Sequence, residues 1–259
     1  MMFHPFHLVE KSPWPLTSSI SAFSLTLGFV NYFNFNNWML ISISFIILFF
    51  SSFQWWRDIS REASFQGFHT LHVLLGLKLG MIFFIFSEVF FFISFFWAFF
   101  HSSLTPSIEI GSNWPPKGIL PFNPFEIPLL NSIILISSGV SVTWTHHCFF
   151  KKDFKSCLYS LKITIFLGVL FTIFQVFEYF QSSFSISDSI FGSSFFLTTG
   201  FHGIHVIIGT TFLLVSLSRI SNNLMTSDHF FGFEASAWYW HFVDVVWLFL
   251  FTFMYWWIY

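Results

Sequence analysis

Residues 81–100 read MIFFIFSEVFFFISFFWAFF, a run of 20 residues in which Glu88 carries the only charge. A helix of about 20 apolar residues is long enough to cross the hydrocarbon core of a bilayer. The whole chain has the same character, because 55% of its 259 residues are hydrophobic, 24% are aromatic and only 8% are charged. Soluble domains carry about 25% charged residues. The sequence therefore predicts an all-α, polytopic membrane protein.

Apolar stretches separated by turn-forming or charged residues predict seven membrane-spanning helices in a single domain, residues 1–259. A charged loop, RDISRE (57–62), should follow the second helix, and a loop rich in Pro and Gly (101–125) should follow the third. At 1.5 Å per residue the third helix is about 45 Å long, so it must tilt or project from the membrane. The first helix is rich in Ser and Thr and has the weakest signal. The expected helices are about 16–33, 38–56, 71–100, 127–149, 156–180, 191–218 and 235–258.

The basic residues indicate how the chain is oriented in the membrane. With seven spans, the N-terminus shares a side with the second, fourth and sixth loops, and the opposite side holds only Lys117. Because basic loops stay inside, the N-terminus should face the cytoplasm or matrix and the C-terminus the outside. The basic residues on the N-terminal side are Lys11, Arg57, Arg61, Lys151, Lys152, Lys155 and Arg219.

Composition and motif content argue against several classes of protein. The formal net charge is −2, whereas a nucleic-acid-binding protein needs a basic face. Cys148 and Cys157 form neither a metal-binding CxxC motif nor a disulfide framework. Residues 1–16 lack the basic region, apolar core and small-residue cleavage site of a signal peptide, so we expect no cleavable targeting segment. No internal repeat is visible, which disfavours an inverted-repeat transporter.

Glu88 is unusual because it lies midway along the expected third helix, and no cationic residue is nearer in sequence than Lys78. An ionised carboxylate without a partner in hydrocarbon costs several kcal/mol. We therefore expect Glu88 to be protonated or hydrogen-bonded. Ionisable groups at this depth are often functional, so Glu88 is a candidate proton-handling or conformational site. The alternative is a neutral acid that only joins its helix to a neighbour.

The segment GFHGIHVIIG (200–209) places His202 and His205 on one face of the sixth helix, three residues apart. Gly203 and Gly209 beside them should allow a close approach of another helix. A metal or haem site is one interpretation, although a membrane metal centre needs further ligands on facing helices. The other interpretation is a polar network in which these histidines are possible hydrogen-bond partners of Glu88.

Charged residues also lie near helix ends. Arg57, Asp58, Arg61 and Glu62 stand where the second helix leaves the membrane. A positive cluster at that depth suits lipid phosphates, and the alternative is a set of local salt bridges of little energetic value. Glu178 lies near the end of the fifth helix, where we expect the membrane interface to make an acid less costly.

The segment WYWHFVDVVW (238–247) is the most distinctive string in the last helix. His241 and Asp244 are three residues apart, so they can bond each other or an adjacent chain. Three tryptophans surround them. The string is therefore typical of a packing and recognition surface rather than an active site.

Taken together, these strings resemble subunit III of cytochrome c oxidase, the mitochondrial type. The resemblance covers essentially the whole chain and includes several long, unusual segments. The segments that carry it are SPWPLT (12–17), QWWRD with the following RE and SFQG (54–67), SEVFFF (87–92), FFWAFFHSS (95–103), WPP with the following GI (114–119), LNSIILISSGVSVTW with the following HH (130–147), GFHGIHVIIG (200–209) and FGFEASAWYWHFVDVVWLFL (231–250).

The resemblance implies a subunit of the proton-pumping terminal oxidase of the mitochondrial inner membrane. Haem and copper belong to the partner subunits I and II, so this chain would carry no cofactor, metal or redox centre of its own. It would support the stability of subunit I and proton uptake, and contact small accessory subunits. Its first two helices would form a bundle separated from the other five by a V-shaped cleft that holds phospholipids. Its N-terminus would face the matrix and its C-terminus the intermembrane space.

The resemblance also implies roles for individual residues. The family's acid at the position of Glu88 reacts with a hydrophobic carbodiimide, which requires a protonated carboxyl in apolar surroundings. Lys78 stands where many family members have Arg. Lysine keeps the positive charge but cannot make the paired hydrogen bonds of a guanidinium group. The residues expected to contact phospholipid are Arg57, Arg61, Glu62, His69, Lys78 and Arg219.

Two other functions compete with the oxidase subunit. A free-standing transporter or proton channel would use Glu88, His202 and His205 as a relay, but repeats and broken helices are missing. A redox-active membrane cytochrome would need two widely spaced histidines on each of two helices, and that spacing is absent from the sequence.

Overall fold

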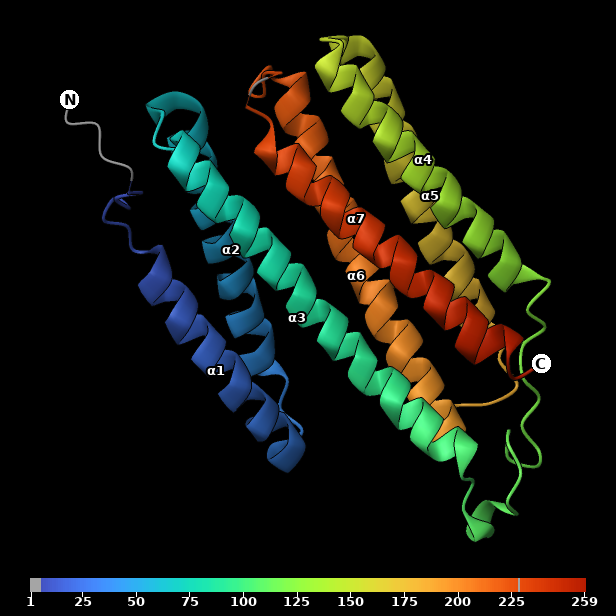
Figure 1. Cartoon of the computed structure of the whole chain (residues 1–259). Coiled ribbons are helices and arrows are strands. Elements are labelled where there is room, and N and C mark those ends of the chain that lie inside the picture. Colours follow the sequence, from blue (N-terminus) through green and yellow to red (C-terminus); the bar gives the residue numbers. More distant parts are fainter. Residues whose placement is uncertain (1–5, 228) are drawn as a thin grey trace. The chain divides into compact units, whose positions relative to one another are not determined.

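The computed structural model describes residues 6–227 and 229–259, and in these residues the chain forms helices and no β-strand (Figure 1). Seven α-helices form, as the sequence predicts. Short π-helical segments, η1 (Glu62–Gln66) and η3 (Phe251–Trp256), extend two of them, and a 3₁₀ turn, η2 (Ile108–Ile110), lies in the loop after the third. The helices are α1 (Trp14–Phe35), α2 (Met39–Arg61), α3 (Leu71–Leu104), α4 (Ile127–Phe150), α5 (Phe154–Phe180), α6 (Ile190–Ser221) and α7 (Phe231–Leu250).

Six of the helices are long and apolar enough to cross a membrane. These are α2 to α7, with α2 counted through η1 and α7 through η3. Helix α1 forms where it is expected, but its serine, threonine and asparagine side chains lower its hydropathy. That α1 also crosses the membrane therefore stays a prediction.

The expectation that RDISRE (57–62) is a loop is wrong. Helix α2 continues through these residues to Arg61, and η1 carries the helical path on to Gln66. Arginine and glutamate are good helix formers, and the positive charge of Arg61 suits the negative end of the helix dipole. The path ends at Gly67, whose φ of 68° is a left-handed conformation that glycine adopts without strain.

Local sequence signals explain where several helices begin. Proline stands in the first turn of α1 and of α4, where its missing N–H is not needed. The side chain of Asp153 accepts a hydrogen bond from the backbone N–H of Ser156 and so caps α5. Hydrogen bonds from Ser156 also lower the pKa of the Asp153 carboxyl. Ser189 caps α6 in the same way through the N–H groups of Phe191 and Gly192.

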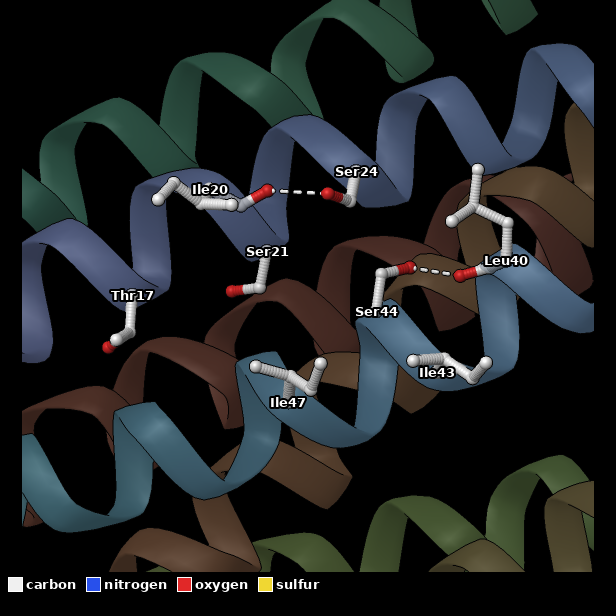
Figure 2. A pocket seen from close by; sticks show the side chains of 8 residues that line it. All are labelled: Thr17, Ile20, Ser21, Ser24, Leu40, Ile43, Ser44 and Ile47. Atoms are coloured by element: carbon white, nitrogen blue, oxygen red, sulfur yellow. Dashed lines mark hydrogen bonds between the residues drawn. The ribbon is translucent and has the colours of Figure 1, made fainter.

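The chain divides into two compact units, the first ending at Leu77 and the second covering Lys78–Tyr259. In the first unit, α1 packs along α2. The Trp14 indole donates to the Asp58 carboxylate at 2.6 Å, and the Ser18 hydroxyl donates to Ser51 at 3.1 Å. A pocket of about 220 Å³ lies between the two helices (Figure 2). It is lined by Thr17, Ile20, Ser21, Ser24, Leu40, Ile43, Ser44 and Ile47.

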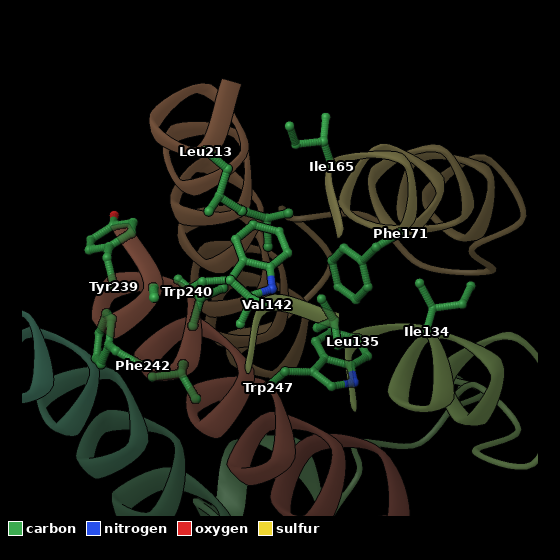
Figure 3. Close-up of a cluster of buried hydrophobic side chains, with 14 of the residues drawn as sticks. Ile134, Leu135, Val142, Ile165, Phe171, Leu213, Tyr239, Trp240, Phe242 and Trp247 are labelled. Atoms are coloured by element: carbon green, nitrogen blue, oxygen red, sulfur yellow. The ribbon is translucent and has the colours of Figure 1, made fainter. Parts of the chain in front are cut away.

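The core of the second unit lies among α4, α5, α6 and α7. Helix α5 packs against α4 and α6, and α7 also packs against α4 and α6, so the four helices enclose a common interior. Trp240 and Trp247 point from α7 into this interior and are fully buried (Figure 3). Their indole N–H groups donate to Ser138 and Ser132 of α4 at 2.9 and 3.0 Å. The packing role expected for the segment around them is confirmed, and its expected role in recognition stays a prediction.

Two glycines allow the helices to approach closely around Trp240. A Cβ atom at Gly168 would lie 2.5 Å from Thr210 Cγ2 and 2.6 Å from the Trp240 ring, and one at Gly209 would lie 2.9 Å from the same ring. Gly209 therefore has the role expected from the sequence. The same expectation for Gly203 is wrong, because no atom lies within 4 Å of a Cβ built there.

Replacement of Gly168 by Ala should lower stability, because the added methyl group has no space. Overpacking typically costs about 1–3 kcal/mol, which exceeds the gain of about 0.5–1 kcal/mol from placing alanine in a helix. We expect the melting temperature of the protein, followed by circular dichroism in detergent, to fall by about 2–4 °C for each kcal/mol lost.

The matched control is Gly203→Ala, which makes the same chemical change at a position with open space. This variant should melt at the wild-type temperature or slightly above it. Equal melting temperatures for the two variants would contradict the close approach at Gly168.

Candidate functional site

Glu88 lies midway along α3, which covers Leu71–Leu104. Its carboxylate meets His205 of α6, with Glu88 Oε2 at 2.9 Å from His205 Nε2. The two residues are 117 positions apart in the chain, so only the packing of α3 beside α6 brings them together. The sequence-based expectation of a hydrogen-bonded acid holds for this geometry, with His205 as the partner.

The second ring nitrogen of His205 determines how protons are arranged in the pair. His205 Nδ1 lies 2.6 Å from the backbone carbonyl oxygen of Phe201. A carbonyl oxygen only accepts, so Nδ1 carries a proton and donates it. Nε2 then either accepts a hydrogen bond from a neutral Glu88 or donates one to an ionised Glu88. In both arrangements one proton lies between the two groups, and the pair as a whole is neutral.

Aromatic rings surround the imidazole of His205. Phe92 meets it edge-on with ring centres 5.0 Å apart, and Tyr239 is stacked at 6.3 Å. An apolar pocket of about 480 Å³, lined by side chains of α3, α7 and η3, includes Val89 next to the acid. The Glu88 side chain keeps 23% of its surface exposed and that of His205 keeps 9%. The pair therefore lies at the edge of the helical bundle, among largely apolar side chains.

His202 is not a partner of Glu88, and that part of the sequence-based expectation is wrong. Its ring is fully buried, with Phe171 at 5.6 Å and Trp247 at 5.3 Å between ring centres. Neither ring nitrogen has a hydrogen-bond partner among the described residues. Residues three apart on a helix differ in direction by roughly 60°, so α3 reaches His205 while His202 points toward α5 and α7.

The residues expected to contact lipid are partnered within the chain. In the first unit, Asp58 lies 3.2 Å from Arg57 and 3.9 Å from Arg61, and Glu62 lies 3.1 Å from His7. The local salt bridges weighed for this segment are therefore present. The His7 ring also meets His69 edge-on, with centres 5.3 Å apart.

Two further residues of that expected set lie in the second unit. Lys78 pairs with Glu234 of α7 at 2.9 Å, so its charge is matched by an acid that sequence reasoning did not single out. Arg219 lies against the N-terminal turn of α7, where a Cβ at Gly232 would be 2.9 Å from its Nη1 atom.

Sequence reasoning also misjudged Glu178. The sequence predicts it at the membrane interface, where an acid costs little free energy. That expectation is wrong, because the residue is 1% exposed. The neighbouring amides of Gln175 and Asn131 are buried with it, and Asn131 Nδ2 donates to Gln175 Oε1 at 3.4 Å. The signal was available in the spacing, since Phe171, Gln175 and Glu178 recur every three or four residues and so share one face of α5.

The last ionisable pair, His241 and Asp244, lies on α7. His241 Nδ1 is 3.8 Å from Asp244 Oδ2, and the same carboxylate packs over Gly139 of α4. Across the described residues, no three or more His, Cys, Asp or Glu side chains form a group that could hold a metal ion.

The fold and this pair define a class: polytopic helical membrane proteins with an intramembrane acid held by an imidazole. Residues 4–259 match the family model of cytochrome c oxidase subunit III. A cytochrome c oxidase subunit 3 from Rhipicephalus sanguineus is 75% identical over 257 residues, which cover 99% of this chain and 100% of the relative. Those of Drosophila melanogaster and Pisaster ochraceus are 58% and 57% identical over 98% of this chain and 97% and 98% of the relatives.

The chain belongs to the cytochrome c oxidase subunit III family, as its sequence motifs predict. It is therefore a membrane subunit of the mitochondrial respiratory chain's terminal oxidase and works in a complex with other oxidase subunits.

A double-mutant cycle tests the coupling between Glu88 and His205. His205→Phe keeps an aromatic ring but leaves the Glu88 carboxyl without its partner, and Glu88→Leu leaves His205 Nε2 without one. Each single change should cost about 1–3 kcal/mol of stability, because an unpaired polar group remains in apolar surroundings. The double variant removes both groups, so its loss should be smaller than the sum of the single losses by about 0.5–3 kcal/mol. Thermal release of the subunit from the purified oxidase measures these differences.

The control cycle uses Ser87→Ala in place of Glu88→Leu. Among the described residues, the Ser87 hydroxyl bonds only the carbonyl oxygen of Phe84 in its own helix. The effects of Ser87→Ala and His205→Phe should add. Additive effects in the Glu88 cycle as well would show that the pair contributes no coupling energy.

Proposed function

We propose that the chain is the non-redox core subunit of the proton-pumping terminal oxidase. Electron transfer from cytochrome c to oxygen then occurs in subunits I and II, which hold the haem and copper. This chain supports the stability of subunit I and its uptake of protons. The observation that carries the proposal is the Glu88–His205 hydrogen bond, an acid and a base that share one proton midway along a membrane helix.

The chemistry of the pair favours a supporting role over charge transport. A neutral acid–imidazole pair and its ion-pair form have the same net charge, so the proton can shift between them without charging the hydrocarbon. The Nδ1–H bond to Phe201 holds the ring in one orientation. A pair of this kind stabilises the arrangement of α3 and α6 and can respond to a change in its electrostatic surroundings.

We also propose phospholipid binding as part of this function. The family resemblance implies a two-helix bundle and a five-helix bundle separated by a V-shaped cleft that holds phospholipids. In support, the Arg57 and Arg61 side chains are 40% and 58% exposed despite their contacts with Asp58. Asp58 and Glu62 balance the two arginines in formal charge, but Glu62 is buried against His7, so the exposed guanidinium groups remain available to a lipid phosphate.

The proposed orientation follows from the same charge distribution. Lysine and arginine gather in the loops on the N-terminal side, so we propose that the N-terminus faces the matrix and the C-terminus the intermembrane space. Subunits I and II and small accessory subunits are the proposed partners. The whole chain acts as one domain in the assembled oxidase.

Glu88→Gln tests the role of the acid. Glutamine has nearly the same shape and can still hydrogen-bond His205, so we expect the complex to assemble and to reduce oxygen at a near-normal initial rate. The loss should be confined to proton pumping or to its persistence over many turnovers. Oxygen consumption and proton release from reconstituted vesicles measure both quantities.

Two further variants give the comparison its control. Ser87→Ala alters the neighbouring position without touching the pair and should behave as wild type. Glu88→Lys should prevent stable packing, because an ammonium group at this position would face His205 and aromatic rings. Complete loss of oxygen reduction in an assembled Glu88→Gln complex would contradict the supporting role.

The lipid proposal predicts that Arg57→Gln with Arg61→Gln weakens phospholipid retention. Each basic residue near a lipid phosphate contributes about 1 kcal/mol, so losing both contacts should weaken binding roughly 30-fold. Mass spectrometry of lipids that copurify with the oxidase measures the change. Lys151→Gln with Lys152→Gln removes two exposed charges elsewhere and serves as the control. Equal phospholipid content in both double variants would argue against this site.

A further inference from the structure

The interior of the second unit contains buried polar atoms without partners. Glu178 is 1% exposed, and neither of its carboxyl oxygens makes a hydrogen bond of good geometry among the described residues, although the Tyr255 hydroxyl is a polar neighbour. Asn131 Oδ1 and both ring nitrogens of His202 also make no hydrogen bond among these residues, and these two side chains are fully buried. Leaving one such group unpaired costs about 1–3 kcal/mol. Buried polar groups in native proteins almost always bond either protein or ordered water.

Asn131 and Glu178 are connected through one polar cluster. Asn131 Nδ2 donates to Gln175 Oε1, and Gln175 Nε2 donates to the Tyr255 hydroxyl, each at 3.4 Å. Gln175 and Glu178 are three residues apart and therefore neighbours on one face of α5. The cluster thus joins α4, α5 and η3, and Glu178 lies within it.

His202 contacts two aromatic residues that neighbour this cluster. Its ring contacts Phe171, which is four residues before Gln175 on α5, and Trp247, whose ring is 5.8 Å from that of Tyr255. Figure 3 shows Phe171 and Trp247 pointing from α5 and α7 into the same interior space. His202 is therefore connected to the amide cluster through Phe171 and Trp247, which contact its ring and neighbour Gln175 and Tyr255.

The chemistry of the unpartnered atoms selects water as the ligand. Asn131 Oδ1 needs a donor, whereas the imidazole of His202 needs both a donor and an acceptor. Water supplies both, and buried waters typically make about three hydrogen bonds to such groups. A metal ion would need several acidic or imidazole ligands together, and the described residues contain no such group.

We propose that an internal water cluster in the core of the second unit hydrogen-bonds Glu178, Asn131 and His202, and that Glu178 is a neutral carboxylic acid there. No lysine or arginine forms an ion pair with Glu178 in the described part of the chain. An ionised carboxylate without a counter-ion in this interior would cost several kcal/mol. The site is distinct from the Glu88–His205 pair, which has its own partners.

Infrared spectroscopy of the purified oxidase tests the state of Glu178. The wild-type complex should show a carboxylic-acid C=O band that moves to lower frequency in D₂O and is lost in Glu178→Gln. Glu88→Gln is the matched control, because it removes a glutamic acid from the middle of another membrane-spanning helix and should leave the Glu178 band in place. A spectrum unchanged by Glu178→Gln would mean that Glu178 is ionised and would overturn the proposal.

A high-resolution cryo-electron microscopy map of the wild-type oxidase tests the water itself and needs no variant. We expect density within hydrogen-bond distance of His202, Asn131 and Glu178, with neighbours at distances typical of water. Three outcomes would overturn the proposal: a dry interior, direct protein contacts to all three side chains, or a density surrounded by the short, numerous oxygen contacts of a cation.

Discussion

Hydrocarbon offers no hydrogen bonds, so each polar group in a membrane-spanning helix must find its partner within protein or bound water. The structure meets this constraint in three ways. Serine and threonine hydroxyls bond carbonyl oxygens three or four residues earlier in their own helices, as Ser44 and Ser87 do. Buried indoles donate across helices, from Trp240 and Trp247 to serines of α4. The Glu88 acid meets an imidazole on α6.

The same constraint explains how the second unit is built. The tryptophans that fill its core also donate hydrogen bonds from α7 to α4. Each of these side chains therefore both buries apolar surface and fixes the position of α7 along α4. Small residues make room for these rings, as Gly168 and Gly209 do around Trp240. Helix α3 packs on the other helices of the unit through phenylalanine side chains, the Lys78–Glu234 ion pair and the Glu88–His205 bond. Between α3 and α6 that bond is a directional contact among apolar ones, so it restricts how α3 is positioned against α6.

Sequence reasoning succeeded where the signal is local. The helices follow from apolar length and from capping residues such as Asp153 and Ser189, because these effects act within a few residues. It failed at RDISRE, where charge was read as a loop although Arg57 to Glu62 are compatible with a helix. It failed again at His202 and Glu178, because the direction of a side chain relative to neighbouring helices depends on packing between distant segments.

By itself, the sequence determined that this is an all-helical membrane protein of the subunit III family and that Glu88 needs a partner. These conclusions rest on hydropathy, on the cost of a lone charge in hydrocarbon and on long characteristic segments. Only the tertiary structure decided that His205 is the partner, that His202 faces aromatic rings, and that Glu178 lies inside a polar cluster. The physical reason is that a helix's own sequence sets which residues share a face, whereas the neighbour that each face meets is set by the packing of the whole bundle.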